Sequence, residues 1–563
     1  MPSSVLTTIT LSIPSRLRPA VSYSFSNLAV AALLTLAFNQ SFMRSVWPLG
    51  GWSVAWPLIS LLFLLNMLIC QLFGVGKLQK SWLITLILIS AVSQYFMLQY
   101  GVLIDKGMLI NALETDGHEI SALLSPEMLP YFICYLLLPA ALVVRAKHHA
   151  ASPGRKLKQY IFSMVSIIDL ILLLVMTQYQ TLAGIMREHR SLKQQSTPYN
   201  ALNAVSGVVR SEILHPVIPV FKHYAQDAKL ISTAVKPQLI VMVLGETVRA
   251  DHLGINGYHR NTTPRLSKRN LVNIGAIDSC GTATAVSVPC MFSYLTHDNY
   301  EETTAKHSDN LLDVLQRAGI KVLWRDNNSG CKKMCDRVEQ DQSFARDCLA
   351  GECQDSALLN GLRQKIMTSA PAATPLFVVL HQQGNHGPEY YKRSLAQQKQ
   401  FLPECENNLL VQCQTEHIIN AYDNAILATD ELLDNTIALL QSLSDQYDTS
   451  LLYVSDHGES LGENGVYLHG LPYWMAPQAQ TRVPMLMWLS EQTLRRSAID
   501  TRCVQHNAAR AGSHDMLFSS ILSWFDVSSE SILPSQNIFY QCSRQIAGKI
   551  VKKHDDSLVK NND

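Results

Sequence analysis

The first third of the chain consists largely of long apolar runs that carry few charges. The runs are, roughly, Leu28–Met43, Val54–Phe73, Trp82–Tyr100, Tyr131–Val144 and Tyr160–Tyr179. Because a helix needs about 20 apolar residues to cross a bilayer, this pattern predicts five transmembrane helices within residues 1–182. Buried helices of a soluble core are the alternative, and the number of runs argues against it. The first run lacks a convincing cleavage site and is expected to stay as an anchor.

After Pro237 the pattern changes to short apolar runs that end in polar, titratable residues. These runs are "QLIVMVLGE", "IKVLWRDNN", "PLFVVLHQQGNH" and "TSLLYVSDHGES", and helix-like stretches such as "SDNLLDVLQRAG" lie between them. The alternation predicts an α/β domain with a largely parallel sheet over residues 236–550. Residues 183–235 fit an amphipathic helix near the membrane surface or an irregular linker about equally well, and residues 551–563 form a polar tail.

Basic residues orient the predicted bundle. They precede the first run and separate the second from the third and the fourth from the fifth: Arg16, Arg18, Lys77, Lys80, Arg145, Lys147, Arg155, Lys156 and Lys158. Such segments stay in the cytoplasm, so five crossings place the second domain outside. The net charge of +1 provides no field that would attract nucleic acid, and no nucleic-acid partner is expected.

Cysteine usage indicates the same compartment. Of twelve cysteines, Cys70 and Cys134 fall in apolar runs, and the other ten lie in the second domain. Eight form close couples, and two remain: Cys280/Cys290, Cys331/Cys335, Cys348/Cys353 and Cys405/Cys413, then Cys503 and Cys542. Zinc knuckles would need regular C-x-x-C repeats, which the couples lack. We therefore predict four local disulfides and a fifth, 503–542, in an oxidising compartment such as a bacterial periplasm.

Titratable side chains follow the predicted strands. Glu246, Asp456 and His457 offer two carboxylates and an imidazole, which suit zinc or manganese, with His386 and His469 as further ligands. In parallel sheets, ligands bind beyond the carboxyl ends of strands, so one site can hold these residues together. Taken singly, each has a simpler explanation, such as a helix cap or a loop ion pair.

The stretch "CGTATAVSVPC" adds a hydroxyl to this set. Proline is tolerated in the first turn of a helix, so Pro289 predicts a helix that begins near Ser287, with Thr284 just before it. Metal coordination can convert Thr284 into a nucleophile, and a helix N-terminus favours the developing negative charge. A disulfide-pinned polar turn whose threonines only cap a helix is the alternative.

Together these motifs resemble a known family. "VLGETVRADHLGINGYHRNTTPRL", "CGTATAVSVPCMFS", "WRDNNSGCKKMC", "HQQGNHGPEYY" and "SDHGESLGENGVYLHG" are similar to the bacterial lipid A phosphoethanolamine transferases. These are membrane-anchored members of the alkaline phosphatase/sulfatase superfamily and include the mobile colistin-resistance enzymes. The resemblance covers nearly the whole chain.

The resemblance implies roles for individual residues. It makes Thr284 the nucleophile and a zinc ligand together with Glu246, Asp456 and His457. Four further residues would hold substrate phosphate or a second zinc, and the histidines among them are the possible general bases: Asn328, Lys332, His386 and His469. In the segment between the third and fourth runs, Asn111, Thr115 and Glu119 are spaced four apart, as on one helix face, and resemble residues that line the donor site. Gly117 weakens a continuous helix there.

The implied enzyme is a zinc-dependent phosphoethanolamine transferase of the bacterial inner membrane, acting as a monomer. It would move phosphoethanolamine from phosphatidylethanolamine to lipid A through a covalent threonine intermediate. The lower negative charge of the outer membrane would weaken polymyxin binding. The alternatives are transfer of phosphoethanolamine or phosphoglycerol to another envelope glycan such as the lipopolysaccharide core, a sulfatase, which would carry Cys or Ser at Thr284, and a catalytically silent membrane sensor.

Overall fold

The computed structural model forms two compact units, and each is described by itself. The described residues are 20–74, 76–114, 117–148, 152–189, 191–210, 220–232, 236–348, 353–369 and 374–542. The first unit holds residues up to 98, 103–106 and 125–207. The second holds 99–102, 107–124 and the chain from residue 208. Arg16, Arg18, parts of the predicted linker and the polar tail 551–563 lie outside the described residues.

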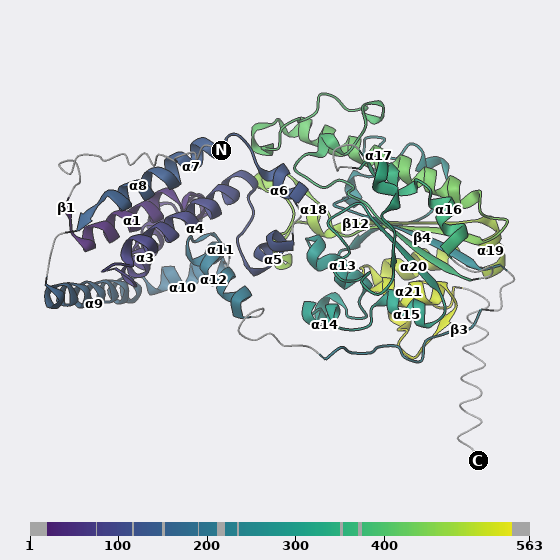
Figure 1. The fold of residues 1–563 in the computed structure, drawn as a ribbon, viewed down its shortest axis with the longest axis horizontal. Helices are drawn as coiled ribbons and strands as arrows, with labels where there is room; N and C mark the ends of the chain where they lie inside the picture. Colours follow the sequence, from purple (N-terminus) through teal and green to yellow (C-terminus); the bar gives the residue numbers. More distant parts are fainter. Residues whose placement is uncertain are drawn as a thin grey trace, which may run out of the picture. The chain divides into compact units, whose positions relative to one another are not determined.

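The first unit is helical (Figure 1), and many large hydrophobic side chains of its long helices are exposed. Its elements are α1 Tyr23–Ala37, α2 Gln40–Val46, α3 Trp52–Gln71, α4 Gln79–Tyr100, α7 Met128–Phe132, η3 Ile133–Leu137, α8 Leu138–Arg145, α9 Pro153–Thr177, α10 Tyr179–Glu188, α11 Ser191–Gln195 and α12 Tyr199–Val208. Among the described residues, four helices are long and apolar enough to cross a membrane: α3, α4, α7–η3–α8 and α9. The prediction of five spans agrees with the structure if the bent pair α1 and α2 counts as one span.

The bend between α1 and α2 measures 57° and is stabilised by hydrogen bonds around Asn39. Asn39 sits at the break, fully buried, and its carboxamide donates hydrogen bonds to the carbonyls of Leu34 and Thr197 at 2.8 and 2.9 Å. The Thr197 hydroxyl in turn donates to the carbonyl of Phe38. These contacts satisfy the polar groups that the interrupted helix exposes inside an apolar bundle.

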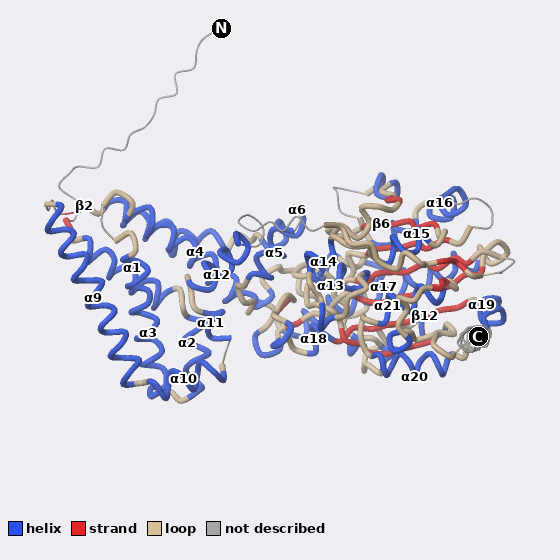
Figure 2. Tube along the Cα trace, turned by 90° about the horizontal axis from the view of Figure 1, so that it is seen from below, coloured by secondary structure: helices blue, strands red, loops and turns tan. Residues whose placement is uncertain are grey.

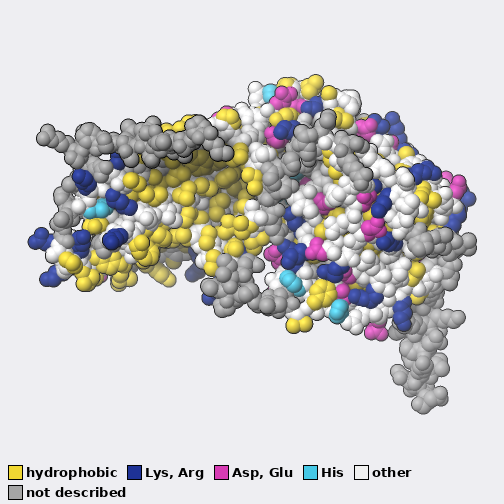
Figure 3. Space-filling view, viewed as in Figure 1, with side chains coloured by type: hydrophobic (Ala, Val, Ile, Leu, Met, Phe, Trp, Pro, Cys, Tyr) yellow, Lys and Arg dark blue, Asp and Glu magenta, His cyan; other side chains and the backbone are white. Residues whose placement is uncertain are grey.

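Side-chain types on this unit follow the pattern of a membrane domain. Hydrophobic side chains cover a broad band of its surface, and Lys and Arg gather at one end (Figure 3). The Lys80 ammonium donates to the carbonyls of Val144 and Ala146, so the basic segments after α3 and α8 meet at one end of the bundle. This is the arrangement that the distribution of Lys and Arg predicts for the cytoplasmic side.

A seven-stranded sheet forms the centre of the second unit within its described residues (Figure 2). Its order is β5-β12-β9-β4-β8-β6-β7, with bounds β4 Gln238–Gly245, β5 Val272–Asp278, β6 Lys321–Asp326, β7 Glu339–Gln340, β8 Leu376–His381, β9 Asp448–Ser455 and β12 Arg482–Leu489. Strands β9, β4, β8, β6 and β7 are parallel, while β12 runs antiparallel to β9 and β5. The prediction of a largely parallel sheet is confirmed. The sequence did not predict that β12 runs antiparallel to its two neighbours.

Helices cover both faces of this sheet, because alternate residues of a strand point to opposite sides. In β4, Ile240, Met242 and Leu244 pack into one core together with α13 Thr284–Phe292, α15 Leu311–Arg317, α20 Thr501–Ala511 and α21 Met516–Trp524. The intervening Leu239, Val241 and Val243 pack into the other core with α16 Leu362–Ser369 and α17 Thr415–Gln441. With both faces covered, β4 is buried along its whole length, which explains its uninterrupted apolar run.

Smaller elements complete the second unit. They are α5 Lys106–Glu114, α6 Gly117–Leu123, α14 Glu302–Lys306, α18 Gln478–Thr481, α19 Glu491–Ser497, the hairpin of β10 Ser460–Leu461 and β11 Tyr467–Leu468, and the pair of β3 Lys229–Leu230 and β13 Val527–Ser528.

The cysteines of the second unit pair as the sequence predicts. All five couples are disulfides: Cys280–Cys290, Cys331–Cys335, Cys348–Cys353, Cys405–Cys413 and Cys503–Cys542. Both cysteines of the third couple are half-buried, and residues 349–352 between them lie outside the described residues. Among the described residues, Cys70 and Cys134 are free thiols. The distribution of paired and free cysteines agrees with an oxidising compartment for the second unit.

Candidate active site

The carboxyl ends of the neighbouring strands β4 and β9 bring three ionisable side chains together. Glu246 follows β4 directly, and Asp456 and His457 follow β9 directly. One ligand atom of each residue lies within 4.8 Å of the others, and all three side chains are fully buried. Two buried carboxylates next to an imidazole form a donor set that suits zinc or manganese.

Hydrogen bonds aim these groups into a common space. The Nδ1 atom of His457 lies 3.0 Å from the carbonyl of Gly458, which places a proton on Nδ1 and turns Nε2 toward the carboxylates. Nε2 lies 3.3 Å from Oε1 of Glu246 and 3.3 Å from Oδ2 of Asp456. Among the described residues, the buried Oδ2 atom of Asp456 has no hydrogen-bond partner. A buried carboxylate oxygen without a donor is the feature expected of a metal ligand.

Electrostatics in the cluster favours a cation. Burial, followed by the nearby Glu246 carboxylate, raises the pKa of Asp456 to about 7. Burial alone would lower the pKa of His457, but the Asp456 and Glu246 carboxylates raise it to about 10. Burial alone would raise the pKa of the Glu246 carboxyl, but the neighbouring His457 holds that pKa well below its usual range. The cluster thus binds positive charge, which a proton or a metal ion can supply.

Thr284 joins the cluster from the opposite side. Its hydroxyl lies 3.2 and 3.1 Å from the two carboxylate oxygens of Glu246 and 3.4 Å from Nε2 of His457. The side chain is buried, and it is the first residue of α13. The hydroxyl therefore lies beside the proposed ligands and at a helix N-terminus.

The predicted start of this helix is wrong. α13 begins at Thr284 rather than near Ser287, so Pro289 lies inside the helix. An interior proline removes one backbone hydrogen bond and costs about 3 kcal/mol in an exposed helix. Here almost the whole of α13 is buried against the sheet, and the Cys280–Cys290 disulfide ties its second half to the preceding loop, so tertiary packing offsets that cost.

The buried His514 connects the loop before Thr284 to β9, the strand that Asp456 and His457 follow. Nδ1 of His514 accepts a hydrogen bond from the backbone N–H of Cys280 at 3.1 Å, and Nε2 donates to the carbonyl of Ser455 at 2.9 Å. Burial lowers the pKa of His514 to about 3, so it stays neutral and keeps both bonds. The Ser287 hydroxyl also donates to the carbonyl of Asp456. These bonds fix Thr284 relative to the ligands.

A second connection fixes the loop that bears His469. The backbone N–H of Gly470 donates to the carbonyl of Thr282 at 2.8 Å, and the Thr282 hydroxyl donates to the carbonyl of Leu471 at 2.6 Å. His469 directly follows β11, so the β10–β11 hairpin and Thr282 hold it from two sides. The nucleophile loop and the His469 loop therefore keep a constant separation.

The His469 ring stands next to His457, and the His386 ring stands next to His469. The rings of His457 and His469 are 4.4 Å apart, and those of His469 and His386 are 5.2 Å apart. Nδ1 of His469 lies 2.8 Å from the Glu459 carboxylate, which also accepts a hydrogen bond from the Tyr390 hydroxyl. Burial raises the pKa of Glu459 to about 8. Glu459 orients His469, as a carboxylate behind a catalytic or metal-binding histidine does.

Asn328 and Lys332 follow β6 on the same edge of the sheet. The Asn328 carboxamide donates to Glu246 at 2.8 Å and to the carbonyl of Gln382 at 2.8 Å, so it positions the Glu246 carboxylate. Lys332 is half-buried and Lys333 is exposed, which distinguishes the two lysines of "GCKKMC". Contact of Asn328 and Lys332 with substrate remains a prediction.

The segment at Cys353, which the Cys348–Cys353 disulfide closes, is hydrogen-bonded to two loops beyond the strand ends. The sequence did not predict these contacts. The carbonyl of Cys353 accepts a hydrogen bond at 3.0 Å from the Asn327 carboxamide, which also donates to Asp355 at 2.7 Å. Asp355 in turn accepts a hydrogen bond from the backbone N–H of Gln383, in the loop after β8, at 2.8 Å. From the sequence, we predicted for Cys353 only its disulfide with Cys348. In the structure, its segment connects the loops that follow β6 and β8.

The segment predicted to line a donor site forms two helices instead of one. Asn111 lies on α5 and Glu119 on α6, so they do not share one helical face. Thr115 and the side chain of Glu119 lie outside the described residues. α6 begins at Gly117, a residue that disfavours the interior of a helix.

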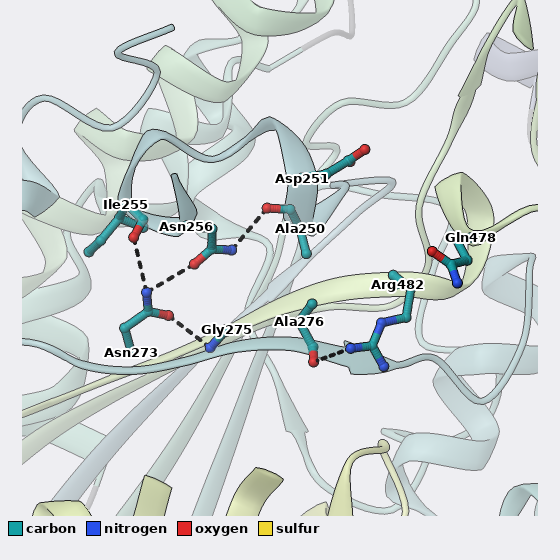
Figure 4. A pocket seen from close by; sticks show the side chains of 9 residues that line it. All are labelled: Ala250, Asp251, Ile255, Asn256, Asn273, Gly275, Ala276, Gln478 and Arg482. Carbon is teal, nitrogen blue, oxygen red and sulfur yellow. Dashed lines mark hydrogen bonds between the residues drawn. The ribbon is translucent and has the colours of Figure 1, made fainter. Parts of the chain in front are cut away.

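A separate polar pocket of about 490 Å³ lies beside the edge strand β5 (Figure 4). Its polar lining residues are Asp251, Asn256, Asn273, Gln478 and Arg482. Asn273 donates to the side chain of Asn256 at 2.9 Å, so part of the lining is already hydrogen-bonded to itself. None of the site residues predicted from the sequence lines this pocket, and Glu246, Asp456 and His457 lie at the strand ends instead.

Known proteins share both units. A family model described as "Sulfatase" matches residues 238–527, and one described as "Phosphoethanolamine transferase EptA/EptB" matches residues 62–213. Phosphoethanolamine transferase EptA of Escherichia coli (strain K12) is 38% identical over 468 residues, which cover 81% of this chain and 84% of that protein. The chain belongs to the EptA phosphoethanolamine transferase family. The resemblance inferred from its motifs is confirmed.

Two other relatives of this transferase extend the match. Phosphatidylethanolamine transferase Mcr-1 of Escherichia coli is 37% identical over 530 residues, 90% of this chain and 95% of that protein. A solved structure also matches: the integral membrane protein lipooligosaccharide phosphoethanolamine transferase A from Neisseria meningitidis. It superposes with a TM-score of 0.88 at 32% identity, and the match covers 93% of this chain and 100% of that chain. The transferase is an integral membrane protein whose catalytic domain is periplasmic.

The sequence interpretation missed several residues that shape the transferase site. Glu459 stood in the quoted motif "SDHGES", and its place two residues after His457 was an available signal. Thr282 lies in the quoted motif "CGTATA", two residues before Thr284. His514 lies in no recognisable motif, and its role depends on two backbone groups far away in sequence, so no local signal could have revealed it.

Proposed function

We propose that this enzyme transfers phosphoethanolamine from phosphatidylethanolamine to a phosphate of lipid A, with Thr284 as the nucleophile. The observation that carries the proposal is the buried Thr284 hydroxyl, 3.1 Å from a Glu246 carboxylate oxygen, within a cluster completed by Asp456 and His457. Relatives named as phosphoethanolamine and phosphatidylethanolamine transferases support the donor. A relative named Kdo(2)-lipid A phosphoethanolamine 7''-transferase supports an acceptor of the lipid A class.

The donor set fits zinc. Glu246, Asp456 and His457 supply three ligand atoms, the unpartnered Oδ2 of Asp456 among them, and the Thr284 hydroxyl supplies a fourth. A zinc ion held there would lower the pKa of the threonine hydroxyl and polarise the phosphoryl group of the substrate. His386 and His469 are proposed to hold substrate phosphate or a second zinc.

The chain's own residues account for the proposed reaction. The Thr284 hydroxyl gives its proton to a neighbouring histidine, and its oxygen forms a bond to the donor phosphorus. The bond from that phosphorus to the diacylglycerol oxygen breaks, and diacylglycerol leaves with a proton from a histidine. A lipid A phosphate oxygen then forms a bond to the same phosphorus, the bond to the Thr284 oxygen breaks, and that oxygen takes back a proton. His469, oriented by Glu459, is suited to donate the proton that diacylglycerol takes, and the N-terminus of α13 stabilises charge on the threonine oxygen. Lys332 is proposed to bind phosphate charge. One chain carries all these residues, which supports an active monomer.

The proposal is tested by mass spectrometry of lipid A from cells with and without the gene. We expect lipid A that gains phosphoethanolamine only when the protein is present, together with reduced polymyxin binding, because each added ammonium offsets a phosphate charge. If the lipopolysaccharide core gained phosphoethanolamine while lipid A did not, the acceptor would be the core, which is the alternative acceptor. An unchanged envelope would overturn the proposed function.

The donor site is proposed to include Asn111, Thr115 and Glu119. A carboxylate at Glu119 would pair with the ethanolamine ammonium, so Glu119→Ala should lower transfer about tenfold or more. Glu119→Gln should retain part of the activity if hydrogen bonding matters more than charge. Assays with a fluorescent phosphatidylethanolamine, run beside zinc analysis, measure the effect. Full turnover of the alanine variant would remove Glu119 from the donor site.

A further inference from the structure

The loop closed by the Cys405–Cys413 disulfide presents apolar side chains to solvent. Val411 is 47% exposed, and Leu402, just before the disulfide, is 67% exposed. Two acidic residues and no basic residue lie between Gln400 and Cys413: Glu404, which pairs with Lys399, and Glu406. Exposed apolar side chains gathered on one disulfide-closed loop favour a contact surface.

The loop is held rigidly, so this exposure is not the result of a loose segment. Two buried side chains of α17 frame Leu402: Asn424 donates to the carbonyl of Phe401 and Asn420 donates to the carbonyl of Pro403, each at 2.8 Å. Next to Val411, Leu409 and Leu410 are fully buried. The exposed side chains stand on a fixed frame.

Hydrogen bonds connect this loop to the segment that leads into the membrane. The Asn408 carboxamide donates to the carbonyl of Ala122 at 2.9 Å and to that of Leu124 at 2.8 Å. Leu124 stands four residues before Met128, where the apolar helix Met128–Arg145 begins. Four residues reach at most about 14 Å, so only a short stretch of chain joins the segment that Asn408 contacts to this membrane-spanning helix. Leu124 and Ile120 of the same segment are 59% and 48% exposed.

We infer that the Cys405–Cys413 loop and the end of α6 form a surface that rests on the bilayer, with Val411, Leu402, Leu124 and Ile120 in the headgroup–acyl boundary. The occupant of this surface is the periplasmic leaflet of the membrane that the chain itself spans. Continuity with the spanning helix makes it the available partner, and the four exposed apolar side chains suit the headgroup–acyl boundary. The contact would keep the catalytic domain at the surface where a lipid donor resides.

Spin-label accessibility tests this inference on the full-length protein in phosphatidylethanolamine/phosphatidylglycerol vesicles. A background with Cys70→Ser and Cys134→Ser removes the free thiols, and Val411→Cys then carries a nitroxide. Met367→Cys is the matched control, because Met367 is 44% exposed on α16, which precedes the amino-terminal end of β8. Oxygen, which is lipid-soluble, and a water-soluble nickel chelate measure the environment of each label.

We expect a several-fold higher ratio of oxygen to nickel accessibility at position 411 than at position 367. Equal, water-like ratios at both positions would overturn the inference. An elevated ratio in vesicles that persists after transfer to a lipid-free amphipathic polymer would also overturn it, because the bilayer would then not be the cause. The readout does not involve turnover, so its outcome is independent of the proposed function.

Discussion

The Thr284→Ala variant is expected to fold, to retain its five disulfides and to lose phosphoethanolamine transfer by at least about a thousandfold. The hydroxyl is the only group that the substitution removes from the reaction, and without it no covalent intermediate can form. Folding should persist, because the methyl group of alanine occupies part of the same buried space, while the helix and its disulfide do not depend on the hydroxyl.

Transfer assays and peptide mass spectrometry check this result. Wild-type enzyme mixed with donor alone should accumulate phosphoethanolamine on the peptide that contains residue 284, and the alanine variant should show none. Thr284→Ser is the matched control, because it keeps the oxygen and should retain measurable transfer. Near-normal modification of lipid A by the alanine variant would exclude Thr284 as the nucleophile.

Asp456→Asn is expected to abolish zinc binding and activity together. The substitution keeps the shape of the side chain and its contacts to backbone N–H groups, but it removes the charge from the oxygen that has no hydrogen-bond partner among the described residues. Mutation of a residue that hydrogen-bonds to a metal ligand typically costs ~10–100-fold in activity, and loss of a ligand itself should reduce transfer by more than that. A chelator should have the same effect on the wild type, and added zinc should reverse it.

Thermal unfolding separates a lost metal site from a damaged fold. Zinc binds the folded protein, so it should raise the Tm of chelator-treated wild type but not that of Asp456→Asn. Asp278→Asn provides the control, because Asp278 is a half-exposed carboxylate paired with Arg482 and should keep its zinc. Full zinc content in purified Asp456→Asn would contradict the proposed ligand set.

Much of this protein was predictable because its signals are local or repeat in the sequence. The apolar runs predicted the membrane helices, and the runs ending in "LGE" and "VSDH" predicted β4 and β9 together with the residues that follow them. Parallel strands share one carboxyl edge, so the approach of Glu246 to Asp456 followed from the fold class alone. The cysteine couples lay close enough in sequence to suggest their own partners.

Other features depended on groups that are distant in sequence. The break between α1 and α2 is stabilised by a contact from Asn39 to Thr197, and the start of α13 at Thr284 is possible because tertiary packing offsets an interior proline. The pairing of Cys353 was predictable, but the hydrogen bond from Asn327 to its carbonyl was not. Periodicity describes only which face of an element is apolar, and it contains no information about such contacts.

The two-part architecture, and the place of Glu246, Asp456 and His457 directly after neighbouring strands, followed from the sequence pattern. How these residues and their neighbours are held depends on the fold: His514 joins the loop before Thr284 to β9, Thr282 fixes the loop of His469, and Glu459 orients that histidine. The physical reason is that a catalytic geometry depends on hydrogen bonds between segments. Their donors and acceptors, mostly backbone groups present in every residue, become specific only when the chain folds.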